Sequence, residues 1–311
     1  MSTPQSIARQ STVAALWMIG AVISFSAMAV SGRELYAELA TYEIMAYRSL
    51  IGVIVIAGLV LWQHGRMAVA TRLSREHGFR NVVHFAAQNC WFFAVATIPL
   101  AQSVALEFTN PLWVAVLAPA LLGERLTRAG AIATLIGFAG ILVVTRPGLS
   151  PLEWGHAAAL GAAAGFALTN IFTKRLSRED DALTILFWMT ASQAVMGFLC
   201  TLPFGGPVLF SWDLTPWVAL VGLCGLTAHW CLTRALFAAP ASVVAPMEFA
   251  RLPVIAAAGA LFYGEALESA VFIGAMLILG GNLYNIHARR RDAVAARSPR
   301  SDGGRARSEV A

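Results

Sequence analysis

Glu107-Phe-Thr-Asn-Pro-Leu-Trp-Val-Ala-Val-Leu-Ala-Pro-Ala-Leu-Leu-Gly-Glu124 is an apolar stretch that has a second copy later in the chain. The second copy reads Glu248-Phe-Ala-Arg-Leu-Pro-Val-Ile-Ala-Ala-Ala-Gly-Ala-Leu-Phe-Tyr-Gly-Glu265, at an offset of 141 residues and without a gap. The same offset aligns further identical residues upstream: Phe25 with Phe166, Cys90 with Cys231, and Pro99 with Pro240. Isolated coincidences do not hold one offset over so long a stretch, so the sequence predicts an internal duplication.

The composition is that of a membrane protein. Hydrophobic residues make up 58% of the chain, charged residues only 13%, and the mean hydropathy is +0.68, whereas soluble domains carry about 25% charged residues. We count ten apolar segments long enough to cross a bilayer, at roughly 12–32, 42–63, 80–98, 101–122, 128–146, 155–173, 182–202, 216–236, 241–264 and 268–287. Five spans per copy oblige the second copy to start on the opposite face. We therefore predict an all-α integral membrane protein of ten transmembrane helices in two inverted five-helix repeats.

The distribution of Lys and Arg predicts the orientation. Of the 22 cationic residues, 18 fall in the termini and in the loops on one side of this topology, and only Arg33 and Arg146 fall in loops on the other. Positive loops face the cytoplasm, so we expect both termini inside, in a bacterial-type inner membrane. The net charge of +5 then reflects topology rather than nucleic-acid binding. The predicted domains are a cytoplasmic N-terminus (1–11), two repeats (12–146 and 147–287) and a basic, disordered cytoplasmic tail (288–311).

Three short motifs resemble those of a known family. They are Pro99-Leu-Ala-Gln-Ser-Val-Ala-Leu-Glu-Phe-Thr-Asn-Pro111, the later Pro240-Ala-Ser-Val-Val-Ala-Pro-Met-Glu-Phe249, and Gly123-Glu-Arg-Leu126. Together with the span pattern over residues 12–287, they are similar to EamA-type members of the drug/metabolite transporter superfamily. The resemblance implies a secondary transporter without a cofactor, which moves a small organic metabolite through a central cavity that opens to each side in turn. The substrate classes implied are amino acids, vitamins, nucleoside-type cofactors and drug-like compounds. The sequence holds no Gly-x-x-x-x-Gly-Lys-Ser/Thr loop for ATP, so we expect transport coupled to protons or to exchange.

Four ionisable residues lie inside predicted spans: Glu107, Glu248, Arg48 and Arg251. A charge inside a bilayer costs at least ~2.5 to 3.5 kcal/mol, so each is a candidate for substrate binding or coupling. Glu107 and Arg48 lie at similar depth and could pair, while Arg251 lies one helical turn after Glu248. Two interpretations stay open: a carboxylate that carries a proton or binds a substrate ammonium, and a carboxylate–guanidinium pair that only clamps two helices.

Polar and aromatic side chains share one face of the third predicted span. They include His84, Gln88 and Trp91, and His229 occupies the Gln88 position in the second copy. Such a face must turn toward protein or water. It could line the substrate cavity, with the rings stacking on a ring-bearing substrate, or it could only form interhelical hydrogen bonds. Asn110 is a further candidate of the same kind.

Prolines predict interruptions in spans four and nine. Pro111, Pro246 and Pro253 each remove a backbone hydrogen bond, so these spans are expected to be kinked. The kinks could move during transport or be static. The second copy has Leu252 at the position of Pro111, so we expect the kink in span nine at a different position from that in span four.

Other classes of protein are less well supported by the residues. A membrane-embedded enzyme would need a nucleophile–base pair or a metal cluster, and the sequence holds no Gly-x-Ser-x-Gly or His-Glu-x-x-His motif. We predict no metal site, and interpret Glu179-Asp-Asp181 as a solvated turn. A binding or scaffold protein without transport is the main alternative. Glycine-rich faces on spans five and ten suit close helix packing and raise the expectation of a homodimer.

Overall fold

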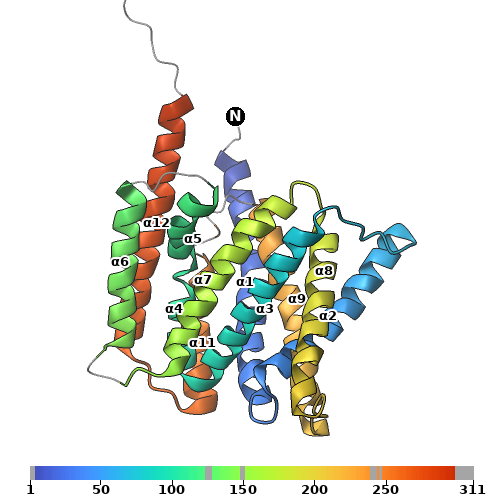
Figure 1. Ribbon diagram of the computed structural model, residues 1–311. Helices are drawn as coiled ribbons and strands as arrows, with labels where there is room; N and C mark the ends of the chain where they lie inside the picture. The colour runs from blue at the N-terminus through green and yellow to red at the C-terminus, as the bar shows by residue number, and fades with distance from the viewer. Residues whose placement is uncertain (1–3, 123–127, 148–150, 239–243, 245–246, 298–311) are drawn as a thin grey trace, which may run out of the picture.

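The structure, a computed structural model, describes residues 4–122, 128–147, 151–238, 244 and 247–297, and consists almost entirely of helices (Figure 1). In chain order the helices are α1 (Pro4–Leu35), α2 (Thr41–His64), α3 (Ser74–Thr97), α4 (Leu100–Glu107), α5 (Asn110–Leu122), α6 (Arg128–Thr145), α7 (Trp154–Leu176), α8 (Ala182–Thr201), η1 (Leu202–Phe204), η2 (Trp212–Leu214), α9 (Thr215–Ala238), α11 (Arg251–Tyr263) and α12 (Ser269–Arg297). A helix satisfies its own backbone hydrogen bonds, which is what a chain in hydrocarbon requires.

Six of these helices are long and apolar enough to cross a membrane, by length and composition, within the part of the chain described. They cover Thr12–Leu35, Thr41–His64, Trp154–Leu176, Ala182–Phe204, Trp212–Ala235 and Ser269–Ala288. The protein is therefore a multi-pass membrane protein. Ala131–Thr145 and Arg251–Tyr263 are shorter apolar helices, α3 carries buried polar residues, and the predicted fourth span is divided into α4 and α5. The count of ten spans stays a prediction.

The helices pack in pairs that join the two halves of the sequence. The most extensive contacts are α1 with α9, α3 with α7, α2 with α8, and α6 with α12. Two short helices, α4 and α11, pack against each other. A large buried cluster that includes Leu35, Phe92 and Leu106 joins elements of both halves. Gly32 lets α1 approach α3, because a Cβ at that position would lie 2.6 Å from the Phe92 ring.

The direction of the helices follows from contacts at their ends. Arg33, near the end of α1, bonds to the backbone carbonyls of Val95 and Ile98 at the end of α3. Gly155, at the start of α7, packs so closely on Ile98 that a Cβ would lie 2.6 Å from its side chain. α1 and α3 thus end where α7 begins. In Figure 1 the first turns of α1 and the last turns of α12 both lie at the opposite, upper end of the bundle.

The last helix is longer than the sequence suggested. α12 continues through Arg297, although we expected disorder from residue 288. The segment contains several Ala and Arg residues, which have high helix propensity, and this favours continuation of the helix beyond the apolar part. Residues 298–311 lie outside the described residues, as do Pro246 and Glu124.

Candidate functional site

Both proline-containing spans are interrupted, and at equivalent positions. α4 ends at Glu107 and α5 begins at Asn110, with Phe108 and Thr109 in a turn. In the second half the turn falls on residues 249–250 and α11 begins at Arg251, again 141 residues later. The expectation that the second kink would lie elsewhere is wrong.

The position of the prolines explains why the breaks coincide. Pro111 is the second residue of α5 and Pro253 is the third residue of α11. Proline is tolerated in the first turn of a helix, where its missing N–H would have no partner within the helix, and it opposes extension of the helix backwards. A shift of one residue therefore leaves both prolines in the first turn of the new helix.

An ion pair joins the two breaks. Arg251 Nη2, at the start of α11, lies 2.7 Å from Glu107 Oε2 at the end of α4, and Trp91 Nε1 of α3 donates to the same oxygen at 2.8 Å. The side chains of Arg251 and Glu107 are 7% and 18% exposed. The Arg251 guanidinium also lies over two rings, 5.2 Å from the centre of Phe25 and 5.1 Å from that of Phe108.

This pairing differs from the one that depth suggested. The sequence placed Arg48 opposite Glu107, but Arg48 lies on α2, which packs on α8 and α9, whereas α4 packs on α11. Depth along a helix says nothing about its lateral neighbours. The second carboxylate, Glu248, is half-buried and within electrostatic range of Arg251 and Glu107. No hydrogen bond or ion pair joins the Glu248 side chain to another described residue.

Arg48 is buried without a carboxylate partner among the described residues. Its side chain points toward α9, where a Cβ on Gly225 would lie 2.7 Å from its Nε. The residue is 6% exposed. Its hydrogen bond within the described chain is a long one from Nη1 to Met45 Sδ at 3.7 Å, and Nε has no partner.

Two histidines lie within electrostatic range of Arg48. His84 of α3 and His229 of α9 both interact electrostatically with Arg48 and with each other. Both ring nitrogens of buried His84 are without a partner, and its ring lies 5.6 Å from that of Phe166. The His229 ring lies edge-on to Phe25 at 5.3 Å. The region thus combines unused hydrogen-bonding groups with aromatic rings.

The polar face predicted for the third span is buried. His84, Gln88 and Trp91 all lie on the inner face of α3, but only Trp91 among them makes a hydrogen bond to another described residue. Asn110 is used in packing: its Nδ2 donates to the Ala163 carbonyl at 3.1 Å, and its Oδ1 accepts from Asn170 at 3.3 Å. That geometry supports the interhelical interpretation for Asn110.

The sequence missed a second group of ion pairs, at the end of the bundle where α1 and α3 end. Arg33 pairs with Glu265, and Arg146 pairs with Glu268. Glu265 Oε2 also accepts from the Leu100 backbone N–H at 2.9 Å. One signal could have found these pairs: Arg33 and Arg146 were the two loop cations assigned to this side, and both glutamates occupy the same connection between α11 and α12.

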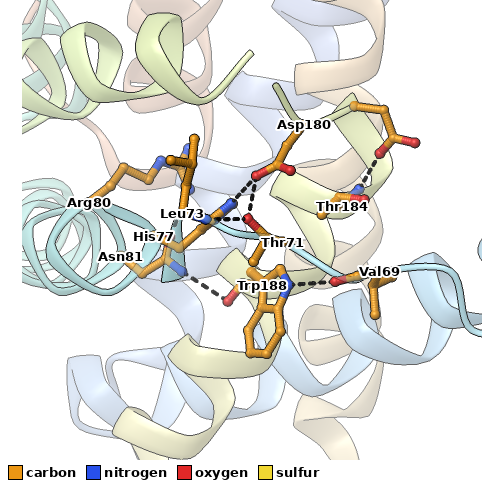
Figure 2. A network of polar contacts seen from close by, with 10 residues as sticks. Val69, Thr71, Leu73, His77, Arg80, Asn81, Asp180, Thr184 and Trp188 are labelled. Atoms are coloured by element: carbon orange, nitrogen blue, oxygen red, sulfur yellow. Dashed lines mark hydrogen bonds and ion pairs between the residues drawn. The ribbon is translucent and has the colours of Figure 1, made fainter. Parts of the chain in front are cut away.

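The opposite end of the bundle holds a hydrogen-bonded carboxylate (Figure 2). Asp180 Oδ2, between α7 and α8, lies 2.8 Å from His77 Nε2 and accepts from Thr71 Oγ1 at 2.7 Å. Trp188 Nε1 donates to the Val69 carbonyl at 2.8 Å, which fastens the same α2–α3 connection to α8. Asp180 is therefore bonded to a neighbouring loop, in contrast to the solvated turn that we expected.

No group of three or more His, Cys, Asp or Glu residues within the described ranges is arranged to hold a metal ion. The central residues offer charged and hydrogen-bonding groups. A paired carboxylate and a second carboxylate in range lie at the two helix breaks, and the same bundle holds a buried arginine without a carboxylate partner among the described residues and unused nitrogens on His84.

Comparison with known proteins gives a consistent result. The model of the EamA-like transporter family matches residues 12–146 and 153–286. A riboflavin transporter of Rhizobium johnstonii is 29% identical over 276 residues, covering 88% of this chain and 91% of the relative. A riboflavin transporter of Vibrio cholerae is 26% identical over 276 residues, covering 85% and 90%.

An S-adenosylmethionine uptake transporter of Rickettsia bellii is 22% identical over 276 residues, covering 88% of this chain and 94% of the relative. A protein of known crystal structure, 20% identical, superposes with a TM-score of 0.61 over 90% of this chain and 98% of that chain, and so shares the fold.

Proposed function

Because the chain belongs to the EamA-like transporter family and is a small-metabolite transporter rather than an enzyme, we propose that it is a secondary transporter working by alternating access around the two helix breaks. The observation that carries this proposal is the meeting of both breaks at one ion pair, Glu107 with Arg251. Discontinuous helices that meet inside the bundle are the usual sites for substrate and coupling ion in secondary transporters.

The proposed architecture is ten spans in two inverted repeats, 12–146 and 147–287. The helix pairs support it: when each helix is exchanged for the one 141 residues away, α1 with α9 becomes α7 with α3, while α2 with α8 and α6 with α12 exchange with themselves. A pseudo-twofold axis that relates the two halves produces this exchange of helix pairs. The antiparallel course of α1 and α7 and the two family matches favour the inverted form.

We place the protein in the inner membrane of a bacterial-type cell with both termini cytoplasmic, on the basis of the cation distribution. The first turns of α1 and the last turns of α12 lie at the same end of the bundle, which agrees with this orientation (Figure 1). The substrate classes to test first are those of the relatives, a vitamin such as riboflavin and a nucleoside-type cofactor such as S-adenosylmethionine. Glu248 is the proposed coupling residue, because it is the central carboxylate without a direct partner in the described chain. A homodimer, formed without nucleic acid or cofactor, completes the proposal.

The proposal is tested by uptake of radiolabelled riboflavin and S-adenosylmethionine into proteoliposomes with and without a pH gradient. We expect accumulation of at least one compound, reduced about tenfold or more in Glu248→Gln at equal folded yield. Glu179→Gln is the matched control, since Glu179 is an exposed loop carboxylate that should leave uptake unchanged. Accumulation by wild type that is unchanged in Glu248→Gln would remove Glu248 from the mechanism. No uptake of either compound by folded protein would refute the transport of these substrate classes.

A further inference from the structure

Two buried arginines have no carboxylate partner among the described residues, whereas a third, Arg251, has one. Arg251 is balanced by Glu107, and Glu248 lies within electrostatic range of the same pair. Arg48 and Arg80 are each only 6% exposed and have no carboxylate partner among the described residues. A buried charge without a counter-ion is costly and is retained in proteins mainly where it has a function.

The two arginines differ in how their hydrogen bonds are used. Arg80 donates from Nε to Thr173 Oγ1 at 3.1 Å and from Nη1 to Asn81 Oδ1 at 3.0 Å, so neighbouring side chains hold its guanidinium. Arg48 has only the long contact to Met45 Sδ, and its Nε is unsatisfied. The donors of Arg48 are therefore free to bind a further group.

No oxygen of the described chain accepts a hydrogen bond from Arg48. Glu43, on the same helix, is used elsewhere, accepting from the backbone N–H groups of Ala40 at 2.8 Å and Val208 at 3.1 Å. The facing residue of α9 is Gly225, which offers no side chain. His84, which is within electrostatic range of Arg48, also has both ring nitrogens unused. Arg48 thus has a buried N–H donor without a partner, and a neutral His84 ring contributes one further unused donor and one unused acceptor.

We propose, on the basis of the transport function proposed above, that the substrate presents a hydrogen-bond-accepting oxygen, neutral or anionic, to Arg48 and His84, and that the site discriminates against cations. An oxygen of either kind accepts hydrogen bonds from the guanidinium, and an anionic oxygen also offsets its charge. A cation placed there is repelled by Arg48 and leaves the donors unsatisfied. The ring contacts of His84 with Phe166 and of His229 with Phe25 supply flat surfaces beside the donors, which suit a substrate whose oxygen is borne on a planar ring.

The inference makes an unusual prediction about stability. Arg48→Met removes an uncompensated buried charge and keeps much of the side-chain volume, so the empty protein should have a higher Tm than wild type. If Arg48 only stabilised the fold, Arg48→Met would instead lower the Tm. The same substitution should weaken binding of an acceptor-bearing substrate about tenfold or more, the value of a hydrogen bond to a charged group.

The experiment measures ligand binding and Tm on purified protein in nanodiscs. The probes are riboflavin, which bears ring carbonyl oxygens, the cation S-adenosylmethionine, and its neutral-sulfur analogue S-adenosylhomocysteine, which differs in the sulfonium methyl group. We expect wild type to bind riboflavin more tightly than the sulfonium compound, and the neutral-sulfur analogue more tightly than its cation. Arg48→Met should lose the riboflavin preference.

Two further variants keep the test decisive. Gly225→Ala keeps the charge but places a methyl group against the guanidinium, and should reduce riboflavin affinity even if Arg48→Met does not fold. Met45→Leu, the control, removes only the long sulfur contact and should change neither affinity nor preference. Tighter binding of the cation than of its analogue, or a lower Tm in Arg48→Met, overturns the inference while uptake in proteoliposomes still supports transport. Absence of uptake of riboflavin and S-adenosylmethionine by folded protein refutes the transport proposal independently of the Tm result.

Discussion

Replacing Glu107 by Gln removes the charge that the Arg251 guanidinium faces at 2.7 Å, while Gln can still accept from Trp91 Nε1. Removing one partner of a buried ion pair typically costs ~3 to 5 kcal/mol, because the other charge stays buried without compensation. We expect the lower end, about 3 kcal/mol, for two structural reasons. Glu248 lies within electrostatic range of Arg251, and two aromatic rings face the guanidinium.

The partner substitution should have a similar cost. Arg251→Met leaves Glu107 with only its bond from Trp91, and a buried carboxylate with one donor is poorly satisfied. The double substitution removes both charges together. It should therefore cost less than the sum of the single substitutions by about 2 kcal/mol, within the range of coupling energies for residues in direct contact.

The assay is a double-mutant cycle of unfolding free energies in mixed micelles, accompanied by Tm values. A loss of about 3 kcal/mol corresponds to a Tm decrease of roughly 6 °C for a chain of this size. The control cycle is Arg146 with Glu268, whose side chains are 35% and 31% exposed. That pair should show a coupling below ~1 kcal/mol. Equal couplings in the two cycles, or strictly additive effects at the central pair, would refute the argument from burial.

Three further predictions concern packing, a loop and topology. Gly140→Ala should destabilise the protein, because the added Cβ would lie 2.7 Å from the Gly274 carbonyl. Gly161→Ala, with open space around it, should stabilise the protein by ~0.5 to 1 kcal/mol. Chemical unfolding measures both free-energy changes, and changes of the same sign would contradict the close approach of the helices. Asp180→Asn should weaken the bond to the α2–α3 connection by ~1 kcal/mol and raise hydrogen exchange in residues 65–73; unchanged exchange there would refute that role. Single cysteines at the exposed positions of Arg66 and Asp213 should label from opposite sides of the membrane, and labelling from one side would refute the proposed topology.

The sequence predicted well those features that depend on position along the chain. The repeat offset anticipated that Phe108 and Phe249 would be equivalent, and they occupy equivalent turns with rings 4.2 Å apart. The helical spacing of His84, Gln88 and Trp91 predicted a common inner face, and all three are buried. Such features follow from periodicity and from depth, which a sequence encodes directly.

What the sequence did not predict depends on which helices are neighbours. In a bilayer the hydrophobic effect does not choose between helix partners, and lateral packing is decided by side-chain shape and polar contacts. Arg48 and Arg251 are both plausible partners of Glu107 by depth, and only the packing of α4 on α11 selects Arg251. The Arg33 pair with Glu265 was missed for the same reason, because its members lie 232 positions apart.

The exchange of partners between the halves limits how the molecule can move. Each extensive helix pair takes one helix from the first half and one from the second, so a motion that drew the halves apart would unpack four helix pairs at once. α6 and α12 approach so closely that a Cβ on Gly140 or Gly274 would lie 2.7 Å from the carbonyl oxygen of the other residue. We therefore expect these two helices to move together. In the proposed alternating-access cycle, the parts that reorient are therefore composite bundles whose boundaries cut across the order of the chain.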